Sequence, residues 1–289
     1  MNYPLEAGGV DDYPVKAGSL LLTMVDPHRG YEKAYNRWYE RDHYYAGCMI
    51  GPWLFAGSRW VAPRVLKDLR WPHGDTIARP FDAGSYVAIY YVEQGHHEDH
   101  FSAWARPQVF SLYGNGRGFA ERRHIHTVLF DRVGDVYRDA DPVPVDLALD
   151  ARYDGLILVW MDGRDAASLH AELAKRLVPD LLEGSDIESV STWTPSAGEN
   201  AERNSPMDLG SRAGGAERAC QLMFVRGDVR DELAGVRRYT DAIEAEGLAD
   251  IRLVAPCRLA TSATTAWPSG DPSAAIIASL LSKTRSVRR

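Results

Sequence analysis

The sequence of 289 residues predicts an α+β fold made of two ferredoxin-like βαββαβ units in one chain. The apolar run at 20–26, LLLTMVD, recurs without a gap as LILVWMD at 156–162, which is 136 residues later. The order strand, helix, strand, strand, helix, strand can be followed twice along the chain. Both copies also carry a long polar insertion between their second and third strands, which supports the repeat.

The first unit is expected within residues 1–140 and is predicted to be the active half. Its strands are runs that are apolar or rich in Val, Ile and Tyr, and its helices have apolar residues at helical spacing. Residues 63–84 contain three Pro and several charges and form the insertion. The predicted strands are 19–25, 53–62, 85–93 and 124–133, and the predicted helices are 31–47 and 97–113.

The second unit is expected within residues 141–289 and is predicted to be a scaffold half with a C-terminal tail. Residues 134–154 are the linker, marked by the run DPVP. The insertion at 195–218 is rich in Gly, Ser, Asn and Glu, and residues 273–283 could form a short terminal helix. The predicted strands are 155–161, 187–194, 219–226 and 250–261, and the predicted helices are 165–178 and 229–246.

An antiparallel sheet with helices on one face leaves its other face bare, and apolar side chains there need a cover. The second sheet can provide that cover within the same molecule. The space between a sheet and its helices is then a natural pocket for a small molecule.

The composition is that of an ordinary globular protein, with 45% hydrophobic and 25% charged residues. The net charge of −7 argues mildly against nucleic-acid binding. No stretch reaches the ~20 apolar residues of a membrane helix, and the N-terminus lacks a signal pattern, so we expect a cytoplasmic protein without membrane partners. Cys48, Cys220 and Cys257 have no CxxC spacing and are expected to be buried thiols. Nucleotide-binding, GxSxG and HExxH motifs are missing.

The helix at 31–47 carries the strongest candidate site. Tyr35, Trp38, Tyr39 and Asp42 are three or four residues apart and therefore share a face, and His43 follows Tyr39 by four. Aromatic walls with an imidazole suit acid–base chemistry on a small molecule. The alternative is a helix that merely packs through its aromatic residues. The second unit has Leu, Val and Pro at 177–179, near the place that corresponds to His43.

The pattern Tyr35-Asn36-x-Trp38-Tyr39-x-x-x-His43, followed by a strand with Arg59, resembles the EthD-like members of the dimeric α/β-barrel superfamily. Tyr45 stands where those proteins usually have Pro. The resemblance implies that the two halves of the chain form an intramolecular dimeric α/β-barrel. It also implies that His43 corresponds to an imidazole that several relatives use as acid or base.

The sequence thus predicts a lyase or isomerase, of dehydratase or cyclase type, acting on an aromatic or polyketide-like substrate without a cofactor. His43 is the expected base, oriented by Asp42 or a neighbouring residue, with Tyr39 or Tyr35 as a donor to a carbonyl oxygen. Arg59 could hold developing negative charge; its alternative is an exposed strand residue paired with a carboxylate. A homodimer is possible, and no metal is expected. The predicted substrate-binding residues are Tyr35, Trp38, Tyr91, Trp104, His124 and His126.

Histidines suggest a different possibility. His96 and His100 lie four apart, and His124 and His126 lie two apart on a strand and should face the same side. Such a set could bind a divalent metal or haem, so a haem or metal enzyme of the same fold is the alternative. A non-catalytic ligand-binding module is a third possibility.

Overall fold

The computed structural model describes residues 14–197 and 205–260. The predicted helix at 273–283 and residues 198–204 of the second polar insertion lie outside the described residues. Within these ranges, no helix is both long enough and apolar enough to cross a bilayer.

Each half of the chain forms an antiparallel four-stranded sheet with the same strand order. The first sheet runs β4–β1–β3–β2 and the second runs β8–β5–β7–β6, so each central pair consists of the first and third strands of its half. The strands are β1 (Ala17–Pro27), β2 (Leu54–Val61), β3 (Tyr86–Glu93), β4 (Arg122–Tyr137), β5 (Gly155–Gly163), β6 (Ile187–Pro195), β7 (Arg218–Val225) and β8 (Ala249–Leu259).

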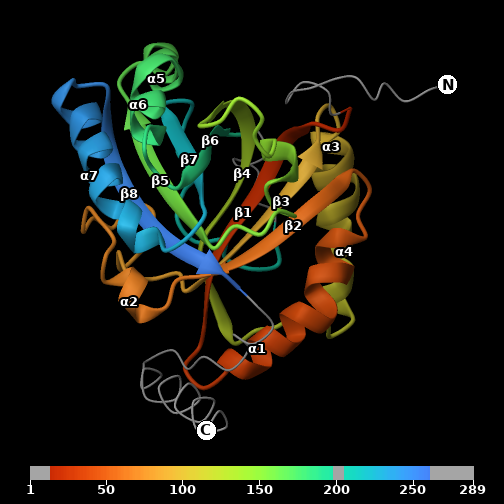
Figure 1. Ribbon diagram of the computed structural model, residues 1–289. Coiled ribbons are helices and arrows are strands. Elements are labelled where there is room, and N and C mark those ends of the chain that lie inside the picture. Colours follow the sequence, from red (N-terminus) through yellow and green to blue (C-terminus); the bar gives the residue numbers. More distant parts are fainter. Residues whose placement is uncertain (1–13, 198–204, 261–289) are drawn as a thin grey trace, which may run out of the picture.

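The two sheets join at both edges into one closed barrel of eight strands (Figure 1). The junction of β4 with β6 is long and extends from Phe130 opposite Pro195 to Tyr137 opposite Ser189. The junction of β2 with β8 is short, with only Trp60 and Val61 paired. The predicted fold class, two ferredoxin-like units in an intramolecular α/β-barrel, is confirmed.

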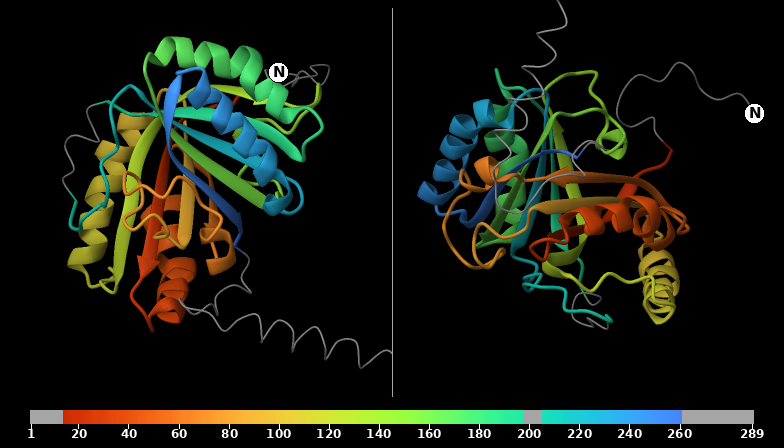
Figure 2. Two further views of the ribbon diagram at one scale, coloured as in Figure 1. Left: turned by 90° about the vertical axis from the view of Figure 1, so that its left-hand side faces the viewer. Right: turned by 90° about the horizontal axis from the view of Figure 1, so that it is seen from below.

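Helices cover the outside of the barrel on two sides. Figures 1 and 2 show α3 and α4 outside the first sheet and α5, α6 and α7 outside the second. The elements of the first half are α1 (Glu32–Trp38), η2 (Tyr39–His43), η3 (Tyr45–Met49), α2 (Arg64–Lys67), α3 (His97–His100), η4 (Phe101–Ala105) and α4 (Arg106–Gly114). Those of the second half and the linker are η5 (Val145–Leu147), α5 (Ala166–Glu172), η6 (Leu173–Leu177), α6 (Val178–Leu182) and α7 (Val229–Ala245).

Several of the predicted helices contain π-helical turns. The helix predicted at 31–47 is α1 followed by the π-helical turns η2 and η3, and the one predicted at 97–113 has η4 in its middle. Single π turns inside helices are rare and often occur at functional sites. Helical periodicity predicts where the helices lie but does not distinguish these wider turns.

The barrel interior is a packed core. It contains Leu20, Tyr91, Trp160 and Trp193, each fully buried, and the ring of Tyr91 stacks on that of Trp193 at 5.5 Å. Two further apolar clusters lie between each sheet and its own helices. The cluster of the first half is rich in Tyr, whereas that of the second half is mostly aliphatic. The two halves therefore fill equivalent spaces with different side chains.

The end of β4 differs from its prediction. The strand was expected to end at residue 133 and to be followed by the linker, but it continues to Tyr137. These last residues pair with β6 of the other half. Long-range pairing of this kind extends a strand beyond its local sequence preference.

Candidate functional site

A cavity of about 170 Å³ lies between the outer face of the first sheet and its helices. Strands β1, β3 and β4 form its floor, the π-helical turns η2, η3 and η4 form its walls, and residues 205–209 border it. The surface of the cavity is mostly apolar, although about half of the lining residues carry a polar group. These include Tyr39, His43, His100, Arg122, His124 and Thr127.

The His43 ring faces this cavity as a neutral imidazole. It stacks on Trp38 with ring centres 4.4 Å apart and meets the Tyr39 ring edge-on. Burial, followed by the positive charge of Arg122, lowers the pKa of His43 to about 3. Among residues 14–197 and 205–260, no group hydrogen-bonds to its nitrogens. The ring is thus held by stacking, and its nitrogens are available to a ligand.

Local backbone geometry places the ring there. The wide turn of a π-helix brings residues four and five apart onto one face, so Tyr39, His43 and Gly47 all border the cavity. Gly47 leaves room for the imidazole, because a Cβ at this position would lie only 2.6 Å from Nδ1 of His43.

His124 lies on β4 and is fixed by hydrogen bonds on both nitrogens. Nε of Arg122 donates to Nε2 of His124 at 3.1 Å, and a guanidinium can only donate. Nε2 must therefore accept, so Nδ1 carries the proton and donates to Oγ1 of Thr127 at 2.7 Å. Burial, together with Arg122, lowers the pKa of His124 to about 3.

Arg122 is a cavity residue that the sequence analysis did not identify. Its guanidinium lies 4.5 Å from the centre of the Trp38 ring and donates to His124, to the backbone oxygen of Phe119 and to the hydroxyl of Tyr113. Within the described residues it pairs with no carboxylate. The available signal was its position two residues before His124, directly ahead of the strand predicted at 124–133.

Three further cavity residues keep their protons at neutral pH. Tyr39 and Tyr90 share a hydrogen bond of 2.5 Å between their hydroxyls, and burial raises the pKa of both well above the usual value. Burial raises the pKa of the Cys48 thiol to about 12. A Cys48 nucleophile is therefore not indicated, and Cys48 is a buried thiol as the sequence predicts.

Of the predicted site residues, Tyr39, His43 and His124 line the cavity, while Trp38 lies directly behind His43. Tyr35 is buried one layer further out, against Tyr86, and burial raises its pKa to about 12. The aromatic side chains on this helix thus form successive layers behind the cavity wall.

Asp42 and Arg59 do not reach the cavity. Asp42 forms an ion pair with Arg117, which lowers the pKa of the Asp42 carboxyl. Contrary to the prediction, Asp42 does not orient His43, because its carboxylate accepts a hydrogen bond from Arg117, which lies 75 residues further along the chain. Arg59 lies 4.2 Å from the centre of the Tyr39 ring and pairs with Glu40. The pairing agrees with the alternative given for Arg59, but its side chain is only 10% exposed, whereas that alternative expected an exposed residue.

His124 and His126 were expected to face the same side, and this expectation is wrong. Val25 of β1 pairs with His124, and the preceding residue, Met24, pairs with His126, so β4 has an extra residue in a β-bulge. His126 consequently points into the barrel, where Nδ1 lies 2.7 Å from Oγ of Ser211. It does not line the cavity.

Tyr91 and Trp104 also lie outside the cavity. Tyr91 is on the barrel side of β3, since its neighbour Tyr90 is on the cavity side and side chains alternate along a strand. Trp104 packs beside His100 with ring centres 5.5 Å apart.

The four histidines of the predicted metal alternative do not converge as a set, although His100 and His124 both border the cavity. His96 stacks on Trp53 and contacts Asp99 at the surface, His100 donates from Nδ1 to the Pro52 oxygen, and His124 and His126 face opposite sides of the sheet. No group of three or more metal-ligating side chains occurs in the described part of the chain.

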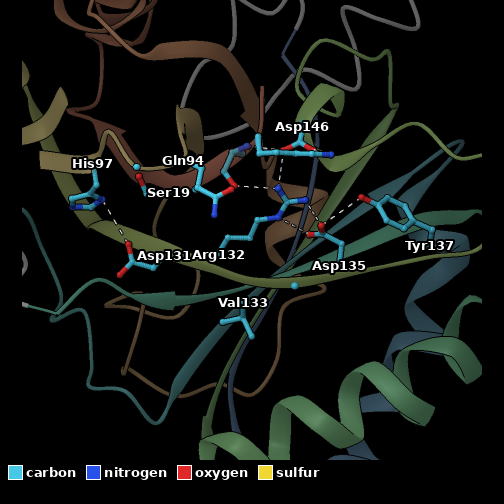
Figure 3. Close-up of a pocket in the computed structure, with 14 residues that line it drawn as sticks. Ser19, Gln94, His97, Asp131, Arg132, Val133, Asp135, Tyr137 and Asp146 are labelled. Carbon is cyan, nitrogen blue, oxygen red and sulfur yellow. Dashed lines mark hydrogen bonds and ion pairs between the residues drawn. The ribbon is translucent and has the colours of Figure 1, made fainter. Parts of the chain in front are cut away.

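A second pocket, of about 680 Å³, lies where the start of β1 meets β4 (Figure 3). Arg132 forms an ion pair with Asp135 and donates to Asp146 at 2.7 Å. Asp146 also accepts from the backbone nitrogen of Ala17 at 2.6 Å. The charges in this pocket are compensated by one another, in contrast to Arg122 in the cavity.

No family model matches the sequence, and no curated protein matches it. Solved structures do match. An anthrone oxidase-like protein has 5% identity and a TM-score of 0.53, with 86% of this chain and 95% of that chain covered. A "Putative monooxygenase" from Fusobacterium nucleatum subsp. nucleatum has 11% identity, coverage of 84% and 94%, and a TM-score of 0.45. A "Putative Chlorite dismutase" has 8% identity, coverage of 86% and 98%, and a TM-score of 0.48.

The protein has the dimeric α/β-barrel fold. At these identities the likeness concerns the fold alone. The neighbours of this α/β-barrel correct one expectation, because the prediction of an enzyme without a cofactor was wrong. The matching structures on which this correction rests include those described as a "Putative monooxygenase" and a "Putative Chlorite dismutase".

Proposed function

We propose that the protein is a cytoplasmic redox enzyme that binds a compact aromatic or polyketide-like molecule in the cavity of its first half and oxidises it with dioxygen. The observation that carries this proposal is the neutral His43 ring, which faces an apolar cavity and has no hydrogen-bond partner among the described residues. The barrel fold, together with neighbours described as oxidase-like and as a monooxygenase, supports the redox assignment.

His43 would remove the proton that must leave before such a molecule is oxidised. In the empty cavity its pKa of about 3 makes it a weak base. A negative charge that develops on a substrate within about 4–6 Å favours the imidazolium and raises that pKa. Proton removal is thus coupled to substrate binding, which leaves the ring neutral until a substrate is present.

The lyase or isomerase reaction predicted from the sequence would begin with the same proton removal. Dehydration, cyclisation and enolisation need no oxidant, whereas the proposed reaction consumes dioxygen. Oxygen uptake that matches product formation would support oxidation, and product formed in an anaerobic cuvette would support the lyase or isomerase reaction.

Haem binding is a second candidate, because His43 offers unbonded ring nitrogens and a single axial histidine can hold haem iron. The cavity does not fit haem, because its volume of about 170 Å³ lies below the usual range of about 300–1,000 Å³ for ligand pockets and admits only a compact molecule. The proposed proton transfer therefore involves no haem. Titration with haemin tests this candidate, since a Soret band that His43→Ala abolishes would support it.

The test of the main proposal is turnover of a panel of monocyclic and bicyclic phenols and enolisable ketones, followed by oxygen uptake and mass spectrometry. His43→Ala should lower turnover by about 100-fold or more, the usual contribution of a general base. His28→Ala is the matched control, because His28 is exposed in the turn after β1. Turnover of His43→Ala close to that of the control would reject His43 as the base.

The second half, in this proposal, supports the first without a site of its own. Leu173, Leu177 and Val178 are buried against its sheet, in the space where the first half has Tyr39 and His43. Leu177→Ala should therefore reduce stability by about 2–5 kcal/mol and leave the turnover of folded protein unchanged. We also propose that the two halves arose by duplication of one EthD-like unit.

A further inference from the structure

Arg122 carries a positive charge at the cavity that no negative group of the described residues balances. Its donors reach the ring of His124, the backbone oxygen of Phe119 and the hydroxyl of Tyr113, all of which are neutral. Within residues 14–197 and 205–260 it forms no ion pair. A cation in an apolar surrounding without a counter-charge is unfavourable unless a ligand supplies that charge.

Two other arginines that are buried or half-buried are compensated by carboxylates, whereas the fully buried Arg70 donates to the backbone oxygens of Phe81, Ala83 and Gly84. Arg218 forms an ion pair with Asp162, and Arg132 pairs with both Asp135 and Asp146. Arg122 differs from Arg218 and Arg132 because it borders the cavity and pairs with no carboxylate among the described residues.

The cavity contributes no other charge. His43 and His124 are neutral, since the pKa of each is about 3. Tyr39 and Tyr90 remain protonated because burial raises the pKa of both. The guanidinium of Arg122 is thus the only charged group among the described lining residues, and its field is little screened in an apolar cavity.

We propose that Arg122 binds the ionised oxygen of the substrate, and that the substrate is a compact molecule with one acidic hydroxyl, a phenol or an enol. This inference rests on the proposed function, because His43 is the base that creates the anion. The O–H bond of the substrate breaks, its proton goes to a ring nitrogen of His43, and its electron pair stays on the oxygen beside Arg122. The net charge of the occupied cavity does not change.

A phenol or enol fits better than a carboxylic acid. A carboxylic acid is already ionised in neutral water, so a base in the cavity would have nothing to remove, and its charge would have to be desolvated on entry. A neutral phenol enters an apolar cavity at lower cost and acquires its charge only beside Arg122. The aromatic walls, which include Tyr39, Tyr90 and Phe101, suit a flat ring.

The test compares two probes of nearly the same shape, 4-nitrophenol and 4-nitrotoluene. The absorption spectrum of 4-nitrophenol reports whether it is bound as its anion. The wild-type protein should bind 4-nitrophenol as the anion even below the pH at which it ionises in water, and about 10- to 100-fold more tightly than 4-nitrotoluene. Arg122→Met should remove this preference, and Arg122→Lys should retain part of it.

Arg117→Met is the matched control, since Arg117 is an exposed arginine paired with Asp42 outside the cavity. It makes the same change of charge and should leave both affinities unchanged, while melting temperatures establish that each variant is folded. Equal affinity of the wild type for both probes, binding of 4-nitrophenol as the neutral phenol, or no binding of either probe would overturn the inference.

The outcome is separable from that of the proposed function. If Arg122 selects the anion but His43→Ala retains full turnover, the inference stands and the assignment of the base fails. If His43→Ala loses turnover but the probes bind equally well, the base stands and the role of Arg122 is wrong.

Discussion

Gly47→Ala is the most direct test of how the cavity holds His43. A Cβ at this position would lie 2.6 Å from Nδ1 and 2.8 Å from Cε1 of the imidazole. Ordinary contact begins at 3.4 Å, so the ring has to move by about 0.8 Å, the difference from 2.6 Å. That movement breaks the stack on Trp38, which holds the ring at 4.4 Å.

The expected effect is large on activity and small on stability. A misplacement of about 1 Å in a reacting group costs about 100-fold in rate, so turnover should fall by that factor. Alanine favours a helix over glycine by about 1 kcal/mol, and strain from an added methyl group costs about 1–3 kcal/mol. The free energy of unfolding should therefore decrease by less than about 2 kcal/mol.

The assay is turnover together with urea denaturation of the same preparation, and nitrogen-15 NMR of the histidines reports the ring directly. Gly235→Ala in α7 is the matched control, because a Cβ there meets only ordinary contacts at 3.9 Å. It should stabilise the protein by about 1 kcal/mol and leave turnover unchanged. A Gly47→Ala variant with full turnover would show that the position of His43 does not matter, which refutes the reasoning.

Three further predictions concern the surroundings of the cavity. The pKa of His43 is lowered from 6.5 to about 3, so the unfolded state binds more protons between these values, and the free energy of unfolding should fall as pH decreases through that window. In His43→Phe, urea denaturation at several pH values should show a dependence of that free energy on pH that is weaker by up to about 1.4 kcal/mol per pH unit. An unchanged dependence on pH would contradict the burial of His43. Asp42→Asn removes only an ion pair with Arg117 at the surface, so turnover should change less than about threefold and the free energy of unfolding by less than about 1 kcal/mol. A loss of turnover of about 100-fold in a kinetic assay would show that Asp42 belongs to the catalytic site. The Tyr91 hydroxyl is buried and has no hydrogen-bond partner within the described residues. Tyr91→Phe should therefore raise the midpoint of thermal unfolding or leave it unchanged, and turnover should not change. A clear loss of stability would reveal a hydrogen-bond partner.

Local patterns were sufficient to predict the elements of the barrel. The runs at 20–26 and 156–162 are central strands because their residues are apolar on both faces, and the helix starting near residue 31 presents Tyr39 and His43 to one side. These features depend on residues that are close in sequence. The same reasoning led to the closed barrel, since each sheet needs a cover for its inner face.

The remaining features of the site depend on contacts between distant segments. Asp42 is engaged by Arg117, and no local rule distinguishes that partner from His43, one residue away. The β-bulge in β4 separates His124 from His126, although strand alternation places them together. Arg122 was missed because it is notable for having no carboxylate beside it among the described residues. A charge without a counter-charge can be identified only when all of its neighbours in space are known.

Both sheets of this barrel belong to one polypeptide, and this permits an asymmetry that two identical subunits do not have. In a symmetric homodimer every substitution occurs twice, so a side chain chosen for the cavity of one subunit is imposed on the other. Here the leucines around residue 177 can maximise the packing of one lobe, while the lobe with His43 retains a void and a half-buried cation. The stability lost by keeping an unfilled space can thus be recovered at a site where no chemistry is required.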